Sequence, residues 1–147
     1  TNGGANAWAV AEHAIALLLA LYKRLVACDA AVRRGDWRQP VDGFNTFELA
    51  GKTVGIVGAG NIGRKVARRL HAFETQILYY DPNEVPELEE ALGARRIRLD
   101  ELVAQADVIS LHAPLTPDTR GLLGAPQFAA MKPGTVLINT SRAELVD

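Results

Sequence analysis

Three glycines, spaced as Gly58-x-Gly60-x-x-Gly63, are the residues whose type and spacing indicate chemistry in this chain. In such a loop the first glycine permits a tight turn, the second lets the backbone approach a phosphate, and the third lets the following helix pack closely. Unpaired N–H groups near Asn61 and Ile62 point away from the start of that helix, whose dipole favours negative charge. We therefore predict that this loop binds phosphate groups.

The segments around the glycines make this prediction more specific. A β-branched run at 53–57 enters the loop, a helical pattern at 61–73 leaves it, and a second strand at 76–80 ends at Asp81. Asp81 lies 23 positions after the first glycine, near the spacing of an acid that accepts hydrogen bonds from ribose hydroxyls. A carboxylate repels a 2′-phosphate, and no arginine occurs at 82–84, so we predict NAD rather than NADP as the cofactor. The alternative is a glycine turn in another α/β protein, and the combination of strand, helix and acid makes it the weaker interpretation.

Composition limits the remaining possibilities. The 147 residues suffice for one domain, and 16 basic against 17 acidic residues give no basic stripe for a nucleic-acid partner. A single cysteine, Cys28, provides neither a disulfide framework nor a CxxC site, so we expect no metal site and a small buried side chain there. The apolar run at 14–22 is too short to span a membrane, and we expect a cytoplasmic protein that is a piece of a longer chain.

Residues 6–34 form a helical pattern that we expect to be one long helix, capped by Asn6 and ended by Gly35. The helix is apolar on most sides, so it must be buried on more than one side. We predict that a second subunit covers this helix, which gives a homodimer through 6–34. The alternative is that a domain missing from this chain covers it. The loop at 35–49 carries aromatic residues that we expect to pack, and we divide the chain into 1–50 and 51–147.

Strands and helices alternate after residue 50, and the short strands are apolar throughout, as strands buried on both faces are. This order predicts an α/β fold, a Rossmann-like doubly wound parallel sheet preceded by the long helix. We expect strands at 53–57, 76–80, 96–98, 107–111 and 135–139, and helices at 61–73, 86–92, 100–106 and 125–131. Pro86 and Pro126 suit first helical positions, Asp100 suits an N-cap and Gly93 suits a helix end. The dinucleotide should lie where the first and fourth strands end.

The whole chain resembles the nucleotide-binding domain of the D-isomer-specific 2-hydroxyacid dehydrogenases, and phosphoglycerate dehydrogenases look closest. The segments that carry the resemblance are 10–13, 49–53, 58–63, 80–82, 107–116, 131–134, 138–142 and 145–147. The resemblance implies hydride transfer between NAD(H) and a 2-hydroxy or 2-oxo acid, with 3-phosphoglycerate as a candidate. It implies that Arg142 is the catalytic arginine that holds the substrate carboxylate, and a guanidinium just past a strand end can do so bidentately.

The resemblance also implies that Thr140 and Ser141 line the nicotinamide side of the cofactor. His112, Ala113 and Pro114 would form the wall on the adenosine side, and Thr119 would contact the cofactor as well. The full predicted cofactor site is Gly58, Gly60, Asn61, Ile62, Gly63, Asp81, Pro82, His112, Ala113, Pro114, Thr119, Thr140, Ser141 and Arg142.

None of the three histidines is our candidate for acid–base catalysis, because the family's histidine and glutamate lie further downstream. We therefore expect this chain alone to bind NAD and to be inactive. Glu74, Ser141, Ala143 and Asn61 depart from the family's usual residues, and Glu74 stands where a glycine is common. The alternative function is an NAD-sensing corepressor on the same fold, and a third, an S-adenosylhomocysteine hydrolase-like domain, does not account for 139–142.

Overall fold

The computed structural model describes residues 4–36 and 46–147. Five strands form one sheet in the order β3-β2-β1-β4-β5, and every pairing is parallel. The switch in strand order falls between β1 and β4, as predicted. The strands are β1 (Thr53–Val57), β2 (Gln76–Tyr80), β3 (Arg95–Arg96), β4 (Val108–Leu111) and β5 (Val136–Asn139).

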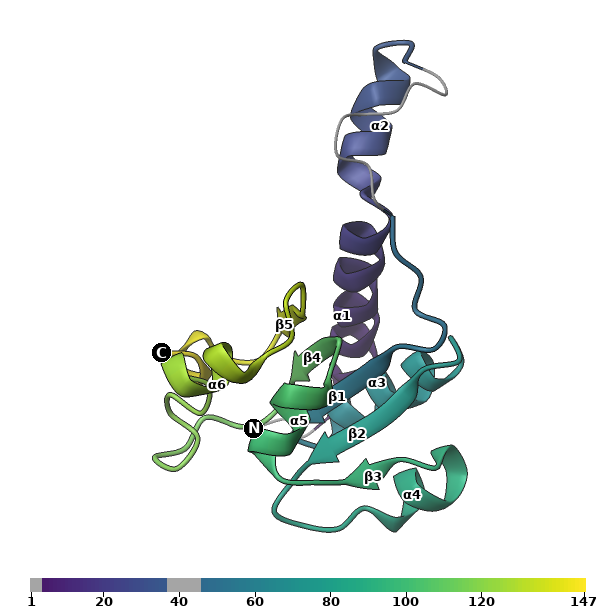
Figure 1. Cartoon of the computed structure of the whole chain (residues 1–147). Helices are drawn as coiled ribbons and strands as arrows, with labels where there is room; N and C mark the ends of the chain where they lie inside the picture. The colour runs from purple at the N-terminus through teal and green to yellow at the C-terminus, as the bar shows by residue number, and fades with distance from the viewer. Residues whose placement is uncertain (1–3, 37–45) are drawn as a thin grey trace.

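Helices cover both faces of the sheet (Figure 1). One core packs α1 (Ala7–Tyr22), α3 (Asn61–His71) and α4 (Pro86–Leu92) against the sheet, and the other core packs α5 (Leu99–Gln105) against it. Adjacent strand residues face opposite layers: Ile56 lies in the first core and Val57 in the second. The remaining elements are α2 (Leu25–Arg33), α6 (Ala125–Ala130), which contacts α5, and the short 3₁₀ helix η1 (Ala143–Leu145). This is the predicted Rossmann-like fold.

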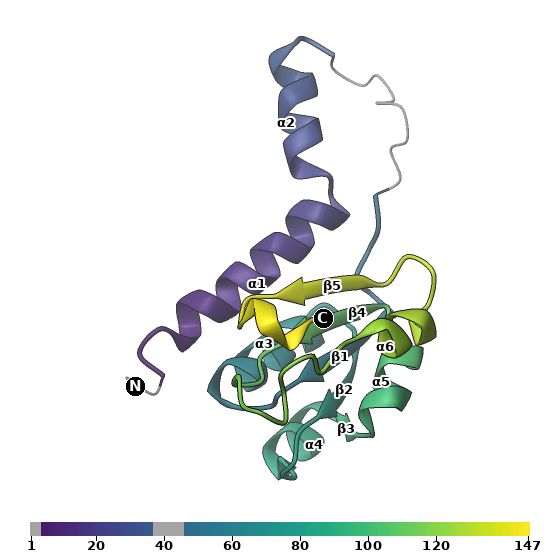
Figure 2. The ribbon, with the colours of Figure 1, turned by 90° about the vertical axis from the view of Figure 1, so that its left-hand side faces the viewer.

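The prediction of one long helix over 6–34 is wrong. The chain breaks at Lys23 and Arg24, where Arg24 adopts a left-handed φ of 49°, and α2 projects away from the sheet (Figure 2). The reason lies in the returning chain. The N–H of Phe47 donates to the carbonyl of Tyr22 at 3.0 Å, and Lys23 Nζ donates to the carbonyl of Phe47 at 2.8 Å. These bonds end α1 by taking a carbonyl that a continuing helix would use.

Several predicted boundaries also change. Asp100 is not an N-cap, because α5 begins at Leu99 after Arg98, and Asp100 lies in its first turn. Pro126 occupies the second helical position of α6, whereas Pro86 and Gly93 take their predicted places at the start and end of α4. Asn6 precedes α1 but makes no side-chain cap. β3 is shorter than predicted and begins earlier, and α3 ends two residues before its predicted end. β4 and β5 each begin one residue later than predicted.

The backbone of Glu74 and the burial of Cys28 also bear on the sequence-based expectations. Glu74 has φ of 62°, so the turn into β2 does require the left-handed conformation that favours glycine. Cys28 is half-buried rather than buried, and its thiol lies 3.4 Å from the carbonyl of Lys23. The aromatics Trp37 and Phe44, which we expected to pack, lie outside the described residues.

Candidate functional site

The glycine loop joins β1 to α3 at the carboxyl edge of the sheet. Gly58 has φ of 91°, and a Cβ there would lie 2.5 Å from the backbone nitrogen of Ala113. A Cβ on Gly63 would lie 2.0 Å from the carbonyl oxygen of Gly58, so only glycine allows α3 to start this close to the strand. Gly60 differs: a Cβ there would meet open space. The loop therefore leaves an uncovered backbone surface at Gly60, as a phosphate cradle requires.

Asp81 at the end of β2 is bound to this loop. Its carboxylate accepts hydrogen bonds from the N–H of Ala59 at 2.8 Å and from the N–H of Asn83 at 2.9 Å. A carboxylate has about four acceptor positions, so two of them stay available to ribose hydroxyls. Pro82 follows directly, and its carbonyl accepts a hydrogen bond from Arg96. The structure thus brings the predicted ribose acid against the predicted phosphate loop.

The end of β4 lies beside the same loop, because the N–H of His112 donates to the carbonyl of Val57 at 2.7 Å. Burial lowers the pKa of His112 to about 4, and its Nε2 lies 2.8 Å from Ser110 Oγ. The ring is therefore neutral near pH 7. Thr119 uses its hydroxyl within its own loop, where it donates to the carbonyl of Pro114 at 2.6 Å and accepts from the N–H of Thr116.

The end of β5 completes this edge. Ser141 Oγ donates to the carbonyl of Ala113 at 2.7 Å, which ties the chain after β5 to the chain after β4. Asn139 braces the turn from both sides, since its side chain accepts from the N–H of Ser141 and donates to the carbonyl of Arg142. Arg142 is exposed, and its guanidinium donates to the carbonyl of Ser141 at 2.9 Å. This contact leaves other N–H groups of the fork available for an anion.

Thr140 supplies an independent sign of a ligand at this edge. Its Oγ1 is the buried side-chain oxygen that finds no hydrogen-bond partner among the described residues. Thr140 and Asn139 border a cavity of about 480 Å³ that lies between β5 and α1, with His13 and Asn6 on the other wall. Buried polar atoms are almost always satisfied, so an unpaired hydroxyl on a residue that borders a cavity is consistent with a polar group bound nearby.

Three residues that the sequence did not predict contact the glycine loop or the loop after β2; they are Gly4, Arg64 and Arg96. Arg64 Nε donates to the carbonyl of Ala59 at 2.9 Å, and its guanidinium also contacts Glu87. The chain before α1 reaches the same place, because a Cβ on Gly4 would lie 3.3 Å from Asn61 Nδ2. Arg96 on β3 contacts the loop after β2. The basic cluster at 95–98 was the available sequence signal for Arg96; the contacts of Arg64 and Gly4 had none.

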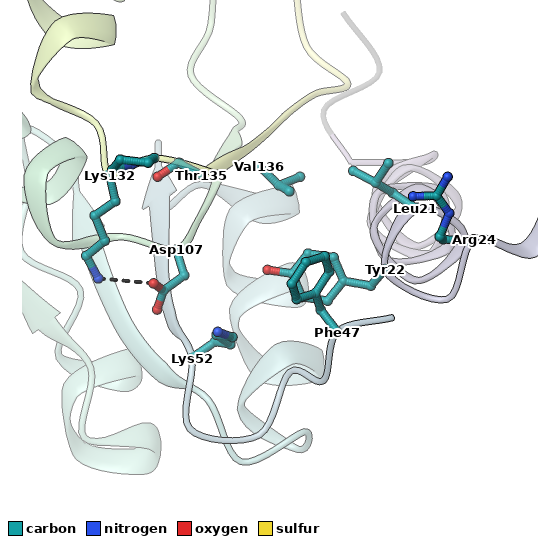
Figure 3. Close-up of a pocket in the computed structure, with 11 residues that line it drawn as sticks. Leu21, Tyr22, Arg24, Phe47, Lys52, Asp107, Lys132, Thr135 and Val136 are labelled. Atoms are coloured by element: carbon teal, nitrogen blue, oxygen red, sulfur yellow. Dashed lines mark hydrogen bonds and ion pairs between the residues drawn. The ribbon is translucent and has the colours of Figure 1, made fainter. Parts of the chain in front are cut away.

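A second cavity of about 410 Å³ lies at the opposite, amino edge of the sheet (Figure 3). Asp107 accepts there from the N–H of Thr53 and from Lys132 Nζ, and the hydroxyl of Tyr22 faces the same space. Burial and then the charge of Asp107 raise the pKa of Tyr22. None of the predicted site residues lines this cavity, so it is separate from the cofactor edge.

Residues 4–36 and 46–147 contain neither a candidate metal site nor a membrane-spanning helix. No group of three His, Cys, Asp or Glu side chains within these ranges is placed to hold a metal ion. Within the same ranges no helix has the length and apolarity needed to cross a membrane.

The parallel sheet, the glycine loop after β1 and the acid after β2 define a dinucleotide-binding domain. The model of the D-isomer specific 2-hydroxyacid dehydrogenase NAD binding domain matches residues 15–147. The chain belongs to this family, whose domain binds NAD. The open backbone at Gly60, the anchored Asp81 and the unpaired Thr140 hydroxyl fit that cofactor.

Relatives and solved structures agree with the family assignment. The chain is 44% identical over 142 residues to a D-3-phosphoglycerate dehydrogenase of Mycobacterium tuberculosis, covering 97% of this chain and 26% of that enzyme. It is 43% identical over 144 residues to a glyoxylate reductase of Thermococcus litoralis, covering 95% and 44%. The apo structure of Escherichia coli D-lactate dehydrogenase superposes with a TM-score of 0.89 at 38% identity, covering 96% and 44%. The chain thus spans less than half the length of these relatives.

Proposed function

We propose that this chain is the cofactor-binding part of an NAD-dependent dehydrogenase that interconverts a 2-hydroxy acid and a 2-oxo acid. One observation carries the proposal: the ends of β1, β2, β4 and β5 are joined by hydrogen bonds into a single edge that holds Asp81 and Arg142. An acid for the ribose and a guanidinium for the substrate on one edge match the needs of this reaction. The relatives' names support the substrate class, with 3-phosphoglycerate as one candidate.

Each predicted site residue has a place in this proposal. The N–H groups of Gly60, Asn61 and Ile62 face the pyrophosphate, while Gly58 and Gly63 shape the turn. Asp81 and Pro82 hold the adenosine ribose. The adenosine wall consists of His112, Ala113 and Pro114, with Thr119 bracing that loop. Thr140 and Ser141 lie on the nicotinamide side, and Thr140 gains a partner for its buried hydroxyl there.

Arg142 acts on the substrate in this proposal. NAD, when bound, supplies or accepts the hydride at its nicotinamide ring. The Arg142 guanidinium binds the substrate carboxylate and polarises the oxygen on C2, while the Asn139 side chain fixes the backbone that carries it. We assign proton transfer to groups outside this chain, because the family resemblance places the histidine and the glutamate that transfer the proton further downstream. The chain alone is therefore expected to bind NAD without turning over a substrate.

The partner and the compartment are part of the same proposal. We infer a homodimer through 6–34, since this region carries apolar side chains that the described chain leaves exposed. They are Trp8, Leu17, Leu21, Leu25, Val26 and Val32. The break at Arg24 divides this surface between α1 and α2, which together extend beyond the sheet (Figure 2). Sedimentation of the purified protein tests the dimer, and a monomer at micromolar concentration would contradict it. The metabolic relatives and the single cysteine favour the cytoplasm.

NADH oxidation by the full-length protein, followed by absorbance against a panel of 2-oxo acids, tests the proposed activity. Turnover is expected with at least one acid of the panel. Arg142→Ala should reduce kcat/KM by about 100-fold or more, because a bidentate charge-assisted contact in a closed site contributes several kcal/mol. NADH affinity should stay within about twofold, because a residue that touches only the substrate leaves cofactor binding unchanged.

Comparing the loss of turnover with the loss of NADH affinity in Arg142→Ala distinguishes a role in substrate binding from a role in cofactor binding or folding. An equal loss of turnover and NADH affinity in Arg142→Ala would show that Arg142 serves the cofactor or the fold instead. NADH binding by the native protein without turnover of any acid in the panel would refute the dehydrogenase and favour the corepressor-type binding protein.

A further inference from the structure

Arg96 on the edge strand β3 spans the loop that carries the ribose acid. Its Nε donates to the carbonyl of Asp81 at 3.0 Å, and its Nη2 donates to the carbonyl of Pro82 at 2.6 Å. Its Nη1 lies 3.6 Å from Glu84 Oε1. A planar guanidinium that engages two successive carbonyls fixes the orientation of the peptide between them, which one rotating donor does not do.

The other contacts of the loop connect Arg96 to the phosphate cradle. The carboxylate of Asp81 accepts from the N–H of Ala59, inside the glycine loop, and from the N–H of Asn83. The backbone of Asp81 is held by Arg96 on one side and its side chain by Ala59 on the other. The position of the acid relative to the loop therefore depends on both contacts.

Direct recognition of a phosphate by the same arginine is the competing interpretation. Arg96 lines a hollow of about 760 Å³ together with Asp81, and Arg95 and Arg98 lie on its walls. The same hollow also contains four carboxylates, which outnumber the three guanidinium groups; they are Asp81, Glu84, Glu89 and Glu101. Such a hollow disfavours an added phosphate dianion, and the carbonyl contacts of Arg96 already occupy two of its donor nitrogens.

We propose that Arg96 is a positioning residue that sets the preference for NADH over NADPH, by fixing the backbone of Asp81 so that its carboxylate meets the ribose hydroxyls. This inference rests on the proposed cofactor site. It predicts that loss of Arg96 loosens the acid, weakens its bonds to the ribose and weakens its repulsion of a 2′-phosphate. Arg96 itself touches neither cofactor.

Fluorescence titration of the purified protein with NADH and with NADPH tests the proposal. Arg96→Gln should weaken NADH binding by about three- to tenfold, less than the loss of one charge-assisted hydrogen bond, because Asp81 keeps its bonds from Ala59 and Asn83; NADPH binding should be unchanged or improved. Arg96→Lys should recover only part of the preference, because an ammonium lacks the fork. Arg95→Gln is the matched control: Arg95 is the neighbouring exposed strand residue, and its side chain makes no hydrogen bond or ion pair within the described chain. It should bind both cofactors like the native protein.

The same substitution in an Asp81→Ala background decides between positioning and direct contact. If Arg96 acts through Asp81, then Arg96→Gln changes neither Kd once the carboxylate is absent. A loss of NADPH binding in that background would overturn the proposal and make Arg96 a phosphate ligand. An unchanged cofactor preference in Arg96→Gln alone would also overturn it. A native protein that binds neither cofactor would instead refute the proposed function.

Discussion

Replacement of Gly60 by alanine should separate cofactor binding from folding. A Cβ at Gly60 has no atom of the described chain within 4 Å, and Gly60 has φ of −73°, which alanine adopts readily. The free energy of unfolding of Gly60→Ala should therefore stay within about 0.5 kcal/mol of the native value, as for a surface substitution.

Binding should respond quite differently. A backbone N–H contacts a phosphate oxygen at about 2.9 Å, whereas a methyl carbon needs about 3.5 Å or more from its neighbours. The added methyl group of Gly60→Ala lies in the space that the structure leaves open for the pyrophosphate, so the phosphates must move away. One lost charge-assisted hydrogen bond is equivalent to about 1.5–3 kcal/mol, and NADH binding should weaken about 10- to 150-fold.

Two assays on the same variant measure the two effects: urea unfolding followed by circular dichroism, and NADH titration followed by fluorescence. Gly63→Ala is the control for a structural glycine. Its Cβ would lie 2.0 Å from the carbonyl oxygen of Gly58, so this variant should lose stability as well as binding. Native NADH affinity in Gly60→Ala would refute the placement of the pyrophosphate, and a large loss of stability would refute the open space at Gly60.

Two further predictions concern the fold. Glu74→Gly should stabilise the protein by about 0.5–1 kcal/mol in thermal unfolding, because relief of a left-handed φ exceeds the added freedom of the unfolded chain. Glu74→Ala keeps a Cβ and should gain nothing; an equal gain there would point to charge rather than backbone strain. Burial alone would raise the pKa of Asp107, but bonds from the Thr53 N–H and Lys132 outweigh it and hold this pKa below the usual value. The resulting stabilisation is complete above the unfolded pKa of about 4 and is lost as pH falls toward the lower folded pKa. The stability difference between the native protein and Asp107→Asn should accordingly shrink below about pH 4 in urea unfolding, and a constant difference would contradict the assignment.

The sequence predicted β1, the glycine loop and β2 well because their signals are local. Strand 53–57, the glycine spacing and strand 76–80 occur at the predicted residues, since a tight turn and a β-branched run depend on neighbouring residues alone. The parallel order then follows from the alternation of strands and helices. The left-handed φ at Glu74 agrees with the family resemblance, in which a glycine is common at this position.

Contacts between distant residues explain what the sequence did not predict. The helix break depends on Phe47, which lies 25 positions after Tyr22 and takes its carbonyl. The role of Arg96 depends on β3 pairing with β2, which places its side chain beside the carbonyl of Asp81. The bond from Ala59 to Asp81 likewise forms only when β1 and β2 are aligned. No local pattern encodes these pairings.

The hydrogen bonds of Asp107 have a consequence for how this domain tolerates change. The backbone N–H of Asp107 donates to the carbonyl of Thr53, and its carbonyl accepts from the N–H of Val136. Its carboxylate accepts from the Thr53 N–H and from Lys132, so the starts of β1, β4 and β5 are aligned at the amino edge. The loops at the far edge are therefore not needed to set strand register. Mutagenesis libraries aimed at new cofactors or substrates can vary the residues of those loops other than Gly58 and Gly63, which tolerate no Cβ, while the Asp107 contacts keep the strands in place.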